Sequence, residues 1–434
     1  MPLALKKLLI AKRSEIVVAI TVIAGAVILK KRLPVEGNDC VLALLLAGIF
    51  VASGGEIKSE MLVFASLFYM HEYMGIADIQ ITVLVVSLSV FYMILAQADY
   101  QKASIKNRTC LMMFIVVFIV FVLHKMGQSQ PHAGSFGWWM GMVGLSYLGL
   151  KVISFLAMHY SGLQREKSWL SFLSYCFYVP TFVAGPLFDY EDYYEQLSDP
   201  FLLNDRIDAV LCGVKRIIVG LFKTRVLSSL TSNFTFYAVS DEVLLSHPLS
   251  HLLGLTYMTM FDLYFNFSGY TDLAIGLSKC IGLRVPENFD YPFVSQNLQD
   301  FWKRWHISLS NWLKKYIYLP LHKVLLEKDL FPPSLAGPIA IMVTFTLMGL
   351  WHGFQINYIL YGVIHGVGLF VVTLWTSSMK KSLLYKKYSN MWGVQLISCL
   401  VTVHYFALSL LVFFADTGHK WNLLTLVVRR VLHA

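Results

Sequence analysis

The sequence predicts an all-helical protein that crosses a membrane many times. Of its 434 residues, 57% are hydrophobic and only 14% are charged, whereas a soluble domain carries roughly 25% charged residues. A bilayer core is crossed by about 20 mostly apolar residues. The clearest apolar runs cover residues 79–98, 110–123, 170–187, 252–277, 354–375 and 394–414. With several shorter runs, they predict about eleven transmembrane helices around a central cavity or funnel.

The first 130 residues form simple apolar spans joined by short loops, and we expect them to be a scaffold. Four cations precede the apolar run 16–29, and "KKRLP" follows it in place of a small-residue cleavage site. We therefore expect a retained anchor helix rather than a signal peptide. The shorter runs 16–29, 41–52 and 61–74 are predicted to be tilted or partial spans.

Charge and cysteine content exclude several classes of protein. The formal net charge of +9 is concentrated in short connections such as "QKASIKNR", "FWKRWH" and "SMKKSLLYKKY", which is typical of cytoplasmic loops. No sizeable soluble domain is available for nucleic-acid binding. The six cysteines are scattered without paired spacing, which argues against a disulfide framework or a zinc site. We expect no bound metal and a multi-pass protein of the cytoplasmic membrane.

The character of the chain changes after the turn-rich stretch "QSQPHAGSFG". The later spans are interrupted by polar and aromatic motifs: "FVAGPLFDYEDYYEQL", "FDLYFNFSGYTDLAIG" and "LMGLWHG". Polar residues at membrane depth are costly and tend to line a cavity or a substrate path. We therefore expect residues 131–376 to form a catalytic core and residues 377–434 to add C-terminal transmembrane helices.

The segment "DFWKRWHISLSNWLKKYIYLPL" has two faces when placed on a helix. Its tryptophans and leucines share one arc, and the opposite arc carries Lys303, Arg304, Lys314 and Lys315. This pattern predicts an amphipathic helix over residues 300–317 in the membrane interface. The basic arc would face lipid phosphates or an anionic partner.

Three histidines are candidates for chemistry. His306 falls on the apolar arc of that predicted helix, where an imidazole needs a hydrogen-bonding partner or a function. His352 follows an apolar run from Ile339 and has Gly349 and Gly353 beside it, so we expect it inside a membrane segment, with a function. The alternative for His352 is packing against a neighbouring helix. The third histidine, His365, is expected to pack between helices or to support the site.

These same residues carry a family resemblance. "PENFDYPFVSQNLQDFWKRWHISLSNWLKKYIYLPL" followed by "LMGLWHG" is similar to the signature of the membrane-bound O-acyltransferases. The bacterial branch of alginate O-acetylation and teichoic acid D-alanyl transfer proteins is the closer match. The similarity covers about residues 141–370. "HKVLLEKDLFPP" after the signature resembles the D-alanyl branch, whereas "FWKRWHISLSNW" resembles the acetyl branch, so both acyl groups stay open.

The resemblance implies roles for individual residues. His352 lies in the motif on which the family relies for catalysis, and His306 is the second signature position. We expect His352 to be a general base and His306 to orient the thioester or donate to its carbonyl oxygen. Expected substrate-binding residues are Trp302, Trp305, Ser310, Asn266, Asn288 and Trp351.

Two of these residues, Asn266 and Asn288, have an alternative role as tethers of irregular backbone, and Asp262 is a further candidate for the cavity wall. The donor would be an acyl carrier protein or acyl-coenzyme A, steered by the basic arc, with no cofactor bound. The acceptor would be a hydroxyl of an envelope polymer, and periplasmic or extracellular accessory proteins are expected partners.

Two functions from other classes compete with the enzyme. A transporter of acyl or lipid-linked groups also needs polar residues along a membrane path, although the chain has no internal repeat. A non-catalytic scaffold of an envelope-modification complex is the third possibility. Loss of His352 distinguishes them, because only an enzyme would lose acyl transfer while keeping its assembly.

Overall fold

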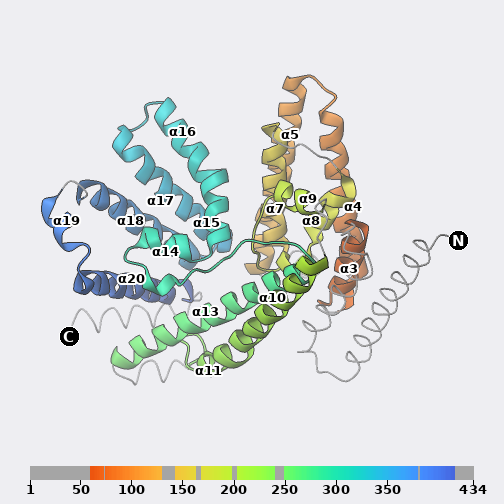
Figure 1. The fold of residues 1–434 in the computed structure, drawn as a ribbon. Coiled ribbons are helices and arrows are strands. Elements are labelled where there is room, and N and C mark those ends of the chain that lie inside the picture. The colour runs from red at the N-terminus through yellow and green to blue at the C-terminus, as the bar shows by residue number, and fades with distance from the viewer. Residues whose placement is uncertain are drawn as a thin grey trace. The chain divides into compact units, whose positions relative to one another are not determined.

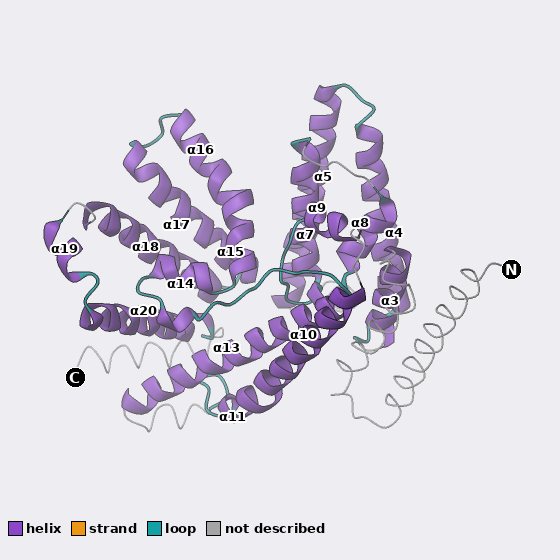
Figure 2. Cartoon of the chain, in the orientation of Figure 1, coloured by secondary structure: helices purple, strands orange, loops and turns teal. Residues whose placement is uncertain are grey.

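A computed structural model describes residues 59–72, 74–129, 142–162, 168–197, 203–239, 249–379 and 382–415. The predicted anchor helix at 16–29, the run at 41–52 and most of the turn-rich stretch lie outside these residues. Within them, helices are joined by loops (Figure 2), and the one β-type contact is an isolated antiparallel bridge between Phe289 and Trp305.

The chain divides into two compact units. The first comprises Met1–Gly220 and Tyr270–Pro286, and the second Leu221–Gly269 and Glu287–Ala434. Helices that begin in the first unit are α3 (Ser59–Glu72), α4 (Asp78–Ala98), α5 (Ala103–Ser129), α7 (Leu145–Tyr160), α8 (Trp169–Phe177), η2 (Val179–Thr181), α9 (Tyr190–Leu197) and α10 (Leu203–Phe222).

The second unit contains the histidine motifs (Figure 1). Helices that begin in it are η3 (Lys223–Leu227), α11 (Ser228–Ser232), α13 (Leu249–Cys280), η4 (Pro292–Val294), α14 (Leu298–Arg304), α15 (Ile307–Leu313), η5 (Lys314–Tyr318), α16 (Leu319–Glu327), α17 (Pro333–His352), α18 (Ile356–Met379), α19 (Leu383–Tyr388) and α20 (Trp392–Phe413).

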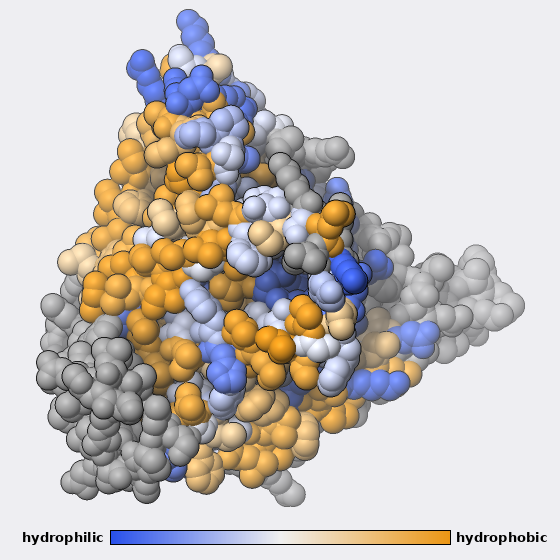
Figure 3. All heavy atoms as spheres, turned by 90° about the vertical axis from the view of Figure 1, so that its left-hand side faces the viewer, coloured by the Kyte–Doolittle hydropathy of each residue, from blue (hydrophilic) through white to orange (hydrophobic). Residues whose placement is uncertain are grey.

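The membrane class is confirmed, but the predicted number of about eleven spans is not. Among the described residues, five helices are long and apolar enough to cross a bilayer: α4, α5, α17, α18 and α20. Large apolar side chains such as Val371, Trp375 and Ile397 are exposed on them. The face seen in Figure 3 is accordingly covered mostly by hydrophobic residues. In a bilayer, such a surface contacts lipid rather than water.

The first unit is held together by aromatic packing around a buried lysine. Phe155 of α7 and Phe172 of α8 have ring centres 4.4 Å apart, and Tyr190 of α9 meets Phe155 edge-on at 5.0 Å. The Lys151 ammonium, 1% exposed, donates to the Tyr175 carbonyl at 3.0 Å and to Thr181 Oγ1 at 2.9 Å. These bonds provide two acceptors for a polar group that would otherwise be costly to bury.

In the second unit, α17 and α18 form a tightly packed helical hairpin (Figure 1). A Cβ atom at Gly349 would lie 2.3 Å from the Tyr358 carbonyl oxygen, and one at Gly362 would lie 2.5 Å from the Phe345 carbonyl oxygen. Glycine at both positions lets the two backbones approach closely, as is common between membrane helices. This contact fixes the turn at residues 353–355, which directly follows His352 at the end of α17.

The predicted single helix over residues 300–317 is wrong. The chain forms α14, leaves the helix at Trp305 and His306, and resumes as α15. His306 has φ 47° and ψ 50°, in the left-handed region, which is unfavourable for a residue with a side chain. The predicted two faces are nevertheless present, because the three tryptophans are buried while Lys303, Lys314 and Lys315 are exposed.

Candidate active site

The break at His306 is caused by pairing with a segment far from it in sequence. The Ile307 amide donates to the Asn288 carbonyl at 3.0 Å, and the Asp290 amide donates to the Arg304 carbonyl at 3.0 Å. The Ser308 amide donates to Asn288 Oδ1, also at 3.0 Å. These bonds satisfy backbone groups that a continuous helix would pair within itself. Asn288 therefore tethers irregular backbone, with its side-chain oxygen occupied.

The His306 ring is packed in an apolar environment. It is 5% exposed and meets the Phe267 ring of α13 edge-on, with ring centres 4.7 Å apart. Burial, and to a smaller extent Coulombic repulsion from His352, lower the pKa of His306 to about 3. Two consequences follow: His306 is neutral at physiological pH, and His352 lies within electrostatic range of it.

His352 is the last residue of α17 rather than a residue in the middle of a membrane helix. The helix ends there because the chain turns at Gly353, where a Cβ atom would lie 2.6 Å from the Tyr358 ring. The imidazole is half-buried and is surrounded by Trp351 at 4.8 Å, Phe413 at 5.2 Å and Tyr361 at 6.4 Å between ring centres. Its partial exposure leaves the ring approachable.

A pocket of about 400 Å³ lies between α14 and α15 on one side and α17 and α18 on the other. We name it the basic pocket; its lining includes Trp302, Lys303, Ser310, Asn311, Lys314 and Tyr318. Its volume falls within the range of small-ligand sites, roughly 300–1,000 Å³. The predicted binding residues Trp302 and Ser310 thus share one pocket with two of the four predicted donor-surface cations.

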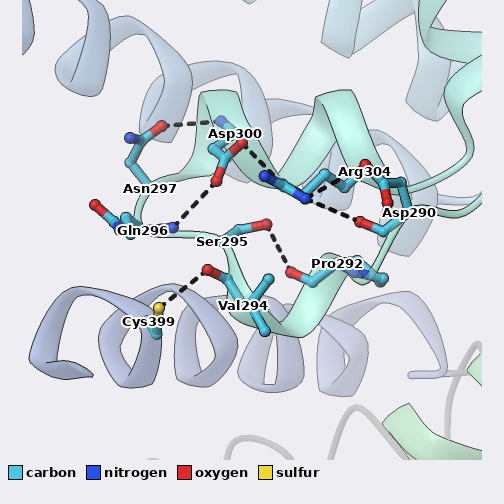
Figure 4. A network of polar contacts seen from close by, with 9 residues as sticks. All are labelled: Asp290, Pro292, Val294, Ser295, Gln296, Asn297, Asp300, Arg304 and Cys399. Atoms are coloured by element: carbon cyan, nitrogen blue, oxygen red, sulfur yellow. Dashed lines mark hydrogen bonds and ion pairs between the residues drawn. The ribbon is translucent and has the colours of Figure 1, made fainter. Parts of the chain in front are cut away.

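Arg304 is engaged inside its own loop, as Figure 4 shows. Its Nε donates to Asp300 Oδ1 at 3.0 Å, and its Nη1 reaches Asp290 Oδ2 at 3.4 Å. Asn297 Oδ1 accepts from the Asp300 amide at 2.9 Å and begins α14. The charge of Arg304 is therefore balanced by two carboxylates, whereas no ion pair is found for Lys303 or Lys314 within the described residues.

The remaining predicted residues lie in different surroundings. Trp305, 4% exposed, stacks on Phe301 with ring centres 5.7 Å apart, which makes it a core residue. Asn266 is exposed on α13. The carboxylate of Asp262, on the same helix, accepts from Ser228 Oγ at 2.7 Å, from Thr231 Oγ1 at 3.2 Å and from the Tyr237 hydroxyl. Asp262 is therefore held by three hydroxyl donors.

Four residues that the sequence did not point to support the candidate site. Asp290, Asn297 and Asp300 order the loop before His306 (Figure 4), and Ser409 of α20 hydrogen-bonds His365 at 2.9 Å. Asn297 had a detectable signal, because it precedes an apolar helix as a capping residue does. Ser409 had none, since it is one serine in an apolar helix. No metal-ligand cluster occurs among the residues that the structure describes.

Comparison with known families decides the class of this chain. A family model described as MBOAT, membrane-bound O-acyltransferase family, matches residues 89–415, most of the chain and all of both histidine motifs. The chain belongs to the membrane-bound O-acyltransferase family. The predicted family and the predicted acyltransferase activity are thereby confirmed.

The relatives include both D-alanyltransferases and O-acetyltransferases, by their names. The chain is 27% identical to a teichoic acid D-alanyltransferase of Bacillus subtilis, over 82% of this chain and 90% of that protein. It is 32% identical to a peptidoglycan O-acetyltransferase of Helicobacter pylori, over 48% of this chain and 39% of that protein. It is also 32% identical to a probable alginate O-acetylase AlgI of Pseudomonas syringae, over 52% of this chain and 42% of that protein. The names of these relatives thus cover two kinds of acyl group.

Proposed function

We propose that this acyltransferase moves an acetyl or D-alanyl group from a cytoplasmic thioester to a hydroxyl of a cell-envelope polymer, with His352 as the general base. The observations that carry the proposal concern two imidazoles of one unit. His306 is buried, and its pKa is lowered by burial and by the charge of His352, while His352 is half-buried at the end of α17. The names of the relatives supply the two acyl groups.

The reaction would proceed in one displacement. The acceptor hydroxyl attacks the thioester carbonyl carbon while His352 removes the hydroxyl proton, a contribution of typically 10²–10⁴-fold. The new C–O bond forms, the C–S bond breaks, and the proton held by His352 passes to the departing thiolate. Neutral His306 has one N–H, which can donate to the carbonyl oxygen as negative charge develops there.

The basic pocket is the proposed entrance for the donor. The thioester arms of acyl carrier proteins and coenzyme A both carry phosphate. Lys303 and Lys314 line the pocket with exposed ammonium groups, which attract such an anion. In this proposal the donor binds at the cytoplasmic interface of the membrane and the acceptor polymer lies outside.

The test is a comparison of envelope polymers by mass spectrometry from cells with the wild-type protein, with His352→Ala and with neither. The proposal expects ester-linked acetyl or D-alanyl groups only with the wild-type protein. Reconstituted protein supplied separately with acetyl-coenzyme A and with a D-alanyl-loaded carrier protein then identifies the donor. Wild-type levels of polymer acylation by His352→Ala would overturn the proposal and favour a scaffold.

A further inference from the structure

His365 lies at the centre of a buried chain of hydrogen bonds that joins three helices. The Trp302 indole N–H, from α14, donates to His365 Nδ1 at 3.3 Å. His365 Nε2, on α18, is 2.9 Å from Ser409 Oγ of α20. Ser409 Oγ in turn donates to the Phe406 carbonyl at 2.7 Å. His365 is completely buried, while Trp302 is 7% and Ser409 4% exposed.

The direction of each bond follows from the number of hydrogens available. A serine hydroxyl has one hydrogen, and that of Ser409 is directed at the Phe406 carbonyl. Ser409 Oγ must then accept from His365, so the hydrogen of the neutral imidazole is on Nε2. This leaves a lone pair on Nδ1, which is what the Trp302 indole N–H requires. All the polar atoms of the chain are satisfied by a single arrangement.

This chain of bonds ends on a wall of the basic pocket. Trp302 lines the pocket, whereas His365 does not. The other contacts of the indole are aromatic: the Phe345 ring, also in the pocket wall, meets it edge-on at 4.9 Å. Ring packing of this kind favours an edge-to-face geometry but leaves the indole N–H without a partner, and a buried Trp N–H usually has one. The bond to His365 Nδ1 is therefore the contact that sets the rotation of the indole.

We infer that His365 is a positioning residue: through Nδ1 it fixes the Trp302 indole and so sets the shape of the pocket that receives the phosphate-bearing thioester arm. The inference rests on the proposed function, because it assigns the pocket to the donor. Its consequence is specific. Loss of the bond should weaken donor binding and leave the chemistry at His352 largely unchanged.

Two amide substitutions separate the halves of the chain. In His365→Asn, the side-chain oxygen lies near the former Nδ1 and can still accept from the indole. In His365→Gln, the amide lies near the former Nε2 and can still reach Ser409, but the acceptor for Trp302 is lost. Trp302→Phe removes the N–H donor together with part of the ring volume, and it keeps an aromatic ring in the pocket. Both amide variants lose the edge-on contact between the His365 and Trp302 rings equally, so their difference reports the hydrogen bond.

The measurement is the donor KM and kcat of purified protein in liposomes, with acetyl-coenzyme A and with a D-alanyl-loaded carrier protein. We expect His365→Gln and Trp302→Phe each to raise the donor KM by roughly 2- to 10-fold, as for one lost hydrogen bond, with kcat within about 2-fold. His365→Asn should stay near the wild-type value. The double variant Trp302→Phe/His365→Gln should be no worse than either single variant.

A matched control is available on α20. Thr402 is 4% exposed and its hydroxyl donates only to the Ser398 carbonyl of its own helix, at 2.8 Å, so Thr402→Val removes a buried hydroxyl outside the chain of bonds. Thr402→Val should leave the donor KM unchanged. Ser409→Ala should raise the donor KM less than His365→Gln does, because the acceptor for the Trp302 indole is kept. Thermal unfolding of every variant controls for damage to the fold.

Two results would overturn the inference: equal effects of His365→Gln and His365→Asn, or an unchanged KM in Trp302→Phe. Failure of the proposed function is a separate outcome, because the wild-type protein would then transfer neither acyl group. An additive KM effect in the double variant would also count against the inference, since it would show that the two residues act independently.

Discussion

The two histidines of the candidate site are positioned in opposite ways. His306 lies in a break between α14 and α15, in a left-handed conformation held by Asn288, a residue 18 positions earlier. His352 ends a regular helix, α17, whose glycine contact with α18 fixes the turn that follows. Local packing of regular helices therefore orients the His352 ring, whereas the His306 ring depends on hydrogen bonds to a distant segment.

Removal of His352 should have the largest effect. His352→Ala is expected to lower kcat for acyl transfer at least about 100-fold, because a general base acts only on the way to the transition state. The protein should keep its melting temperature within a few degrees, since the ring is half-buried at a helix end. Transfer assays with reconstituted protein measure this. A variant that lost folding together with activity would contradict the separate role given to this ring.

The glycine contact should be the next most sensitive feature. In Gly349→Ala, the new methyl group would meet the Tyr358 carbonyl at 2.3 Å, and overpacking of this kind costs about 1–3 kcal/mol. We expect a lower melting temperature and a lower kcat, because the turn holding His352 shifts. Gly254→Ala is the control, since a Cβ atom there meets nothing within 4 Å. Equal stability of both variants would show that the hairpin is not tightly packed.

The tether at His306 should be sensitive to the loss of one amide. Asn288→Ala leaves the Ser308 amide without its partner in a buried region, at a cost of about 1–3 kcal/mol. Transfer should fall together with the melting temperature. Asn266→Ala, at an exposed position on α13, serves as the matched control and should leave stability unchanged. If the two asparagine variants behaved alike, the role of Asn288 as a tether would be refuted.

Acid should destabilise the segment around His306 specifically. Its pKa is about 3 in the folded protein and about 6.5 otherwise. Between these values the unfolded chain binds more protons, so stability is complete above about pH 6.5 and declines as pH falls. The slope contributed by this residue is up to about 1.4 kcal/mol per pH unit. Between pH 7 and pH 4, the melting temperature should therefore fall less steeply with decreasing pH for His306→Asn than for the wild type.

The smallest effect is expected at the pocket entrance. Lys303→Glu combined with Lys314→Glu should raise the donor KM several-fold and weaken its dependence on salt, because exposed charges act through a screened attraction. Lys323→Glu with Lys328→Glu makes the same change in net charge on α16 and its C-terminal end, outside the pocket lining. Donor titrations at two ionic strengths measure both. A KM that rose equally in the two double variants would indicate an effect of net charge alone.

The sequence predicted some features of the segment around His306 and missed others. The buried tryptophans and exposed lysines of residues 302–315 were predictable, because burial follows a helical period on both sides of the two-residue break. The break itself was not predictable, since residues 300–317 contain neither proline nor glycine. At Asn288 the structure favours the tethering alternative over direct substrate binding. Arg304, predicted to face the donor, is instead paired with Asp290 and Asp300.

The sequence by itself determined the membrane class, the family and the two histidine motifs, because composition and contiguous motifs are properties of neighbouring residues. Only the tertiary structure decided how those motifs are oriented. The bonds from Asn288 to Ser308, from Trp302 to His365 and from His365 to Ser409 join residues 20, 63 and 44 positions apart. A helical period relates only residues three or four positions apart. Contacts between distant residues exist only once helices pack, so they leave no pattern in a single sequence.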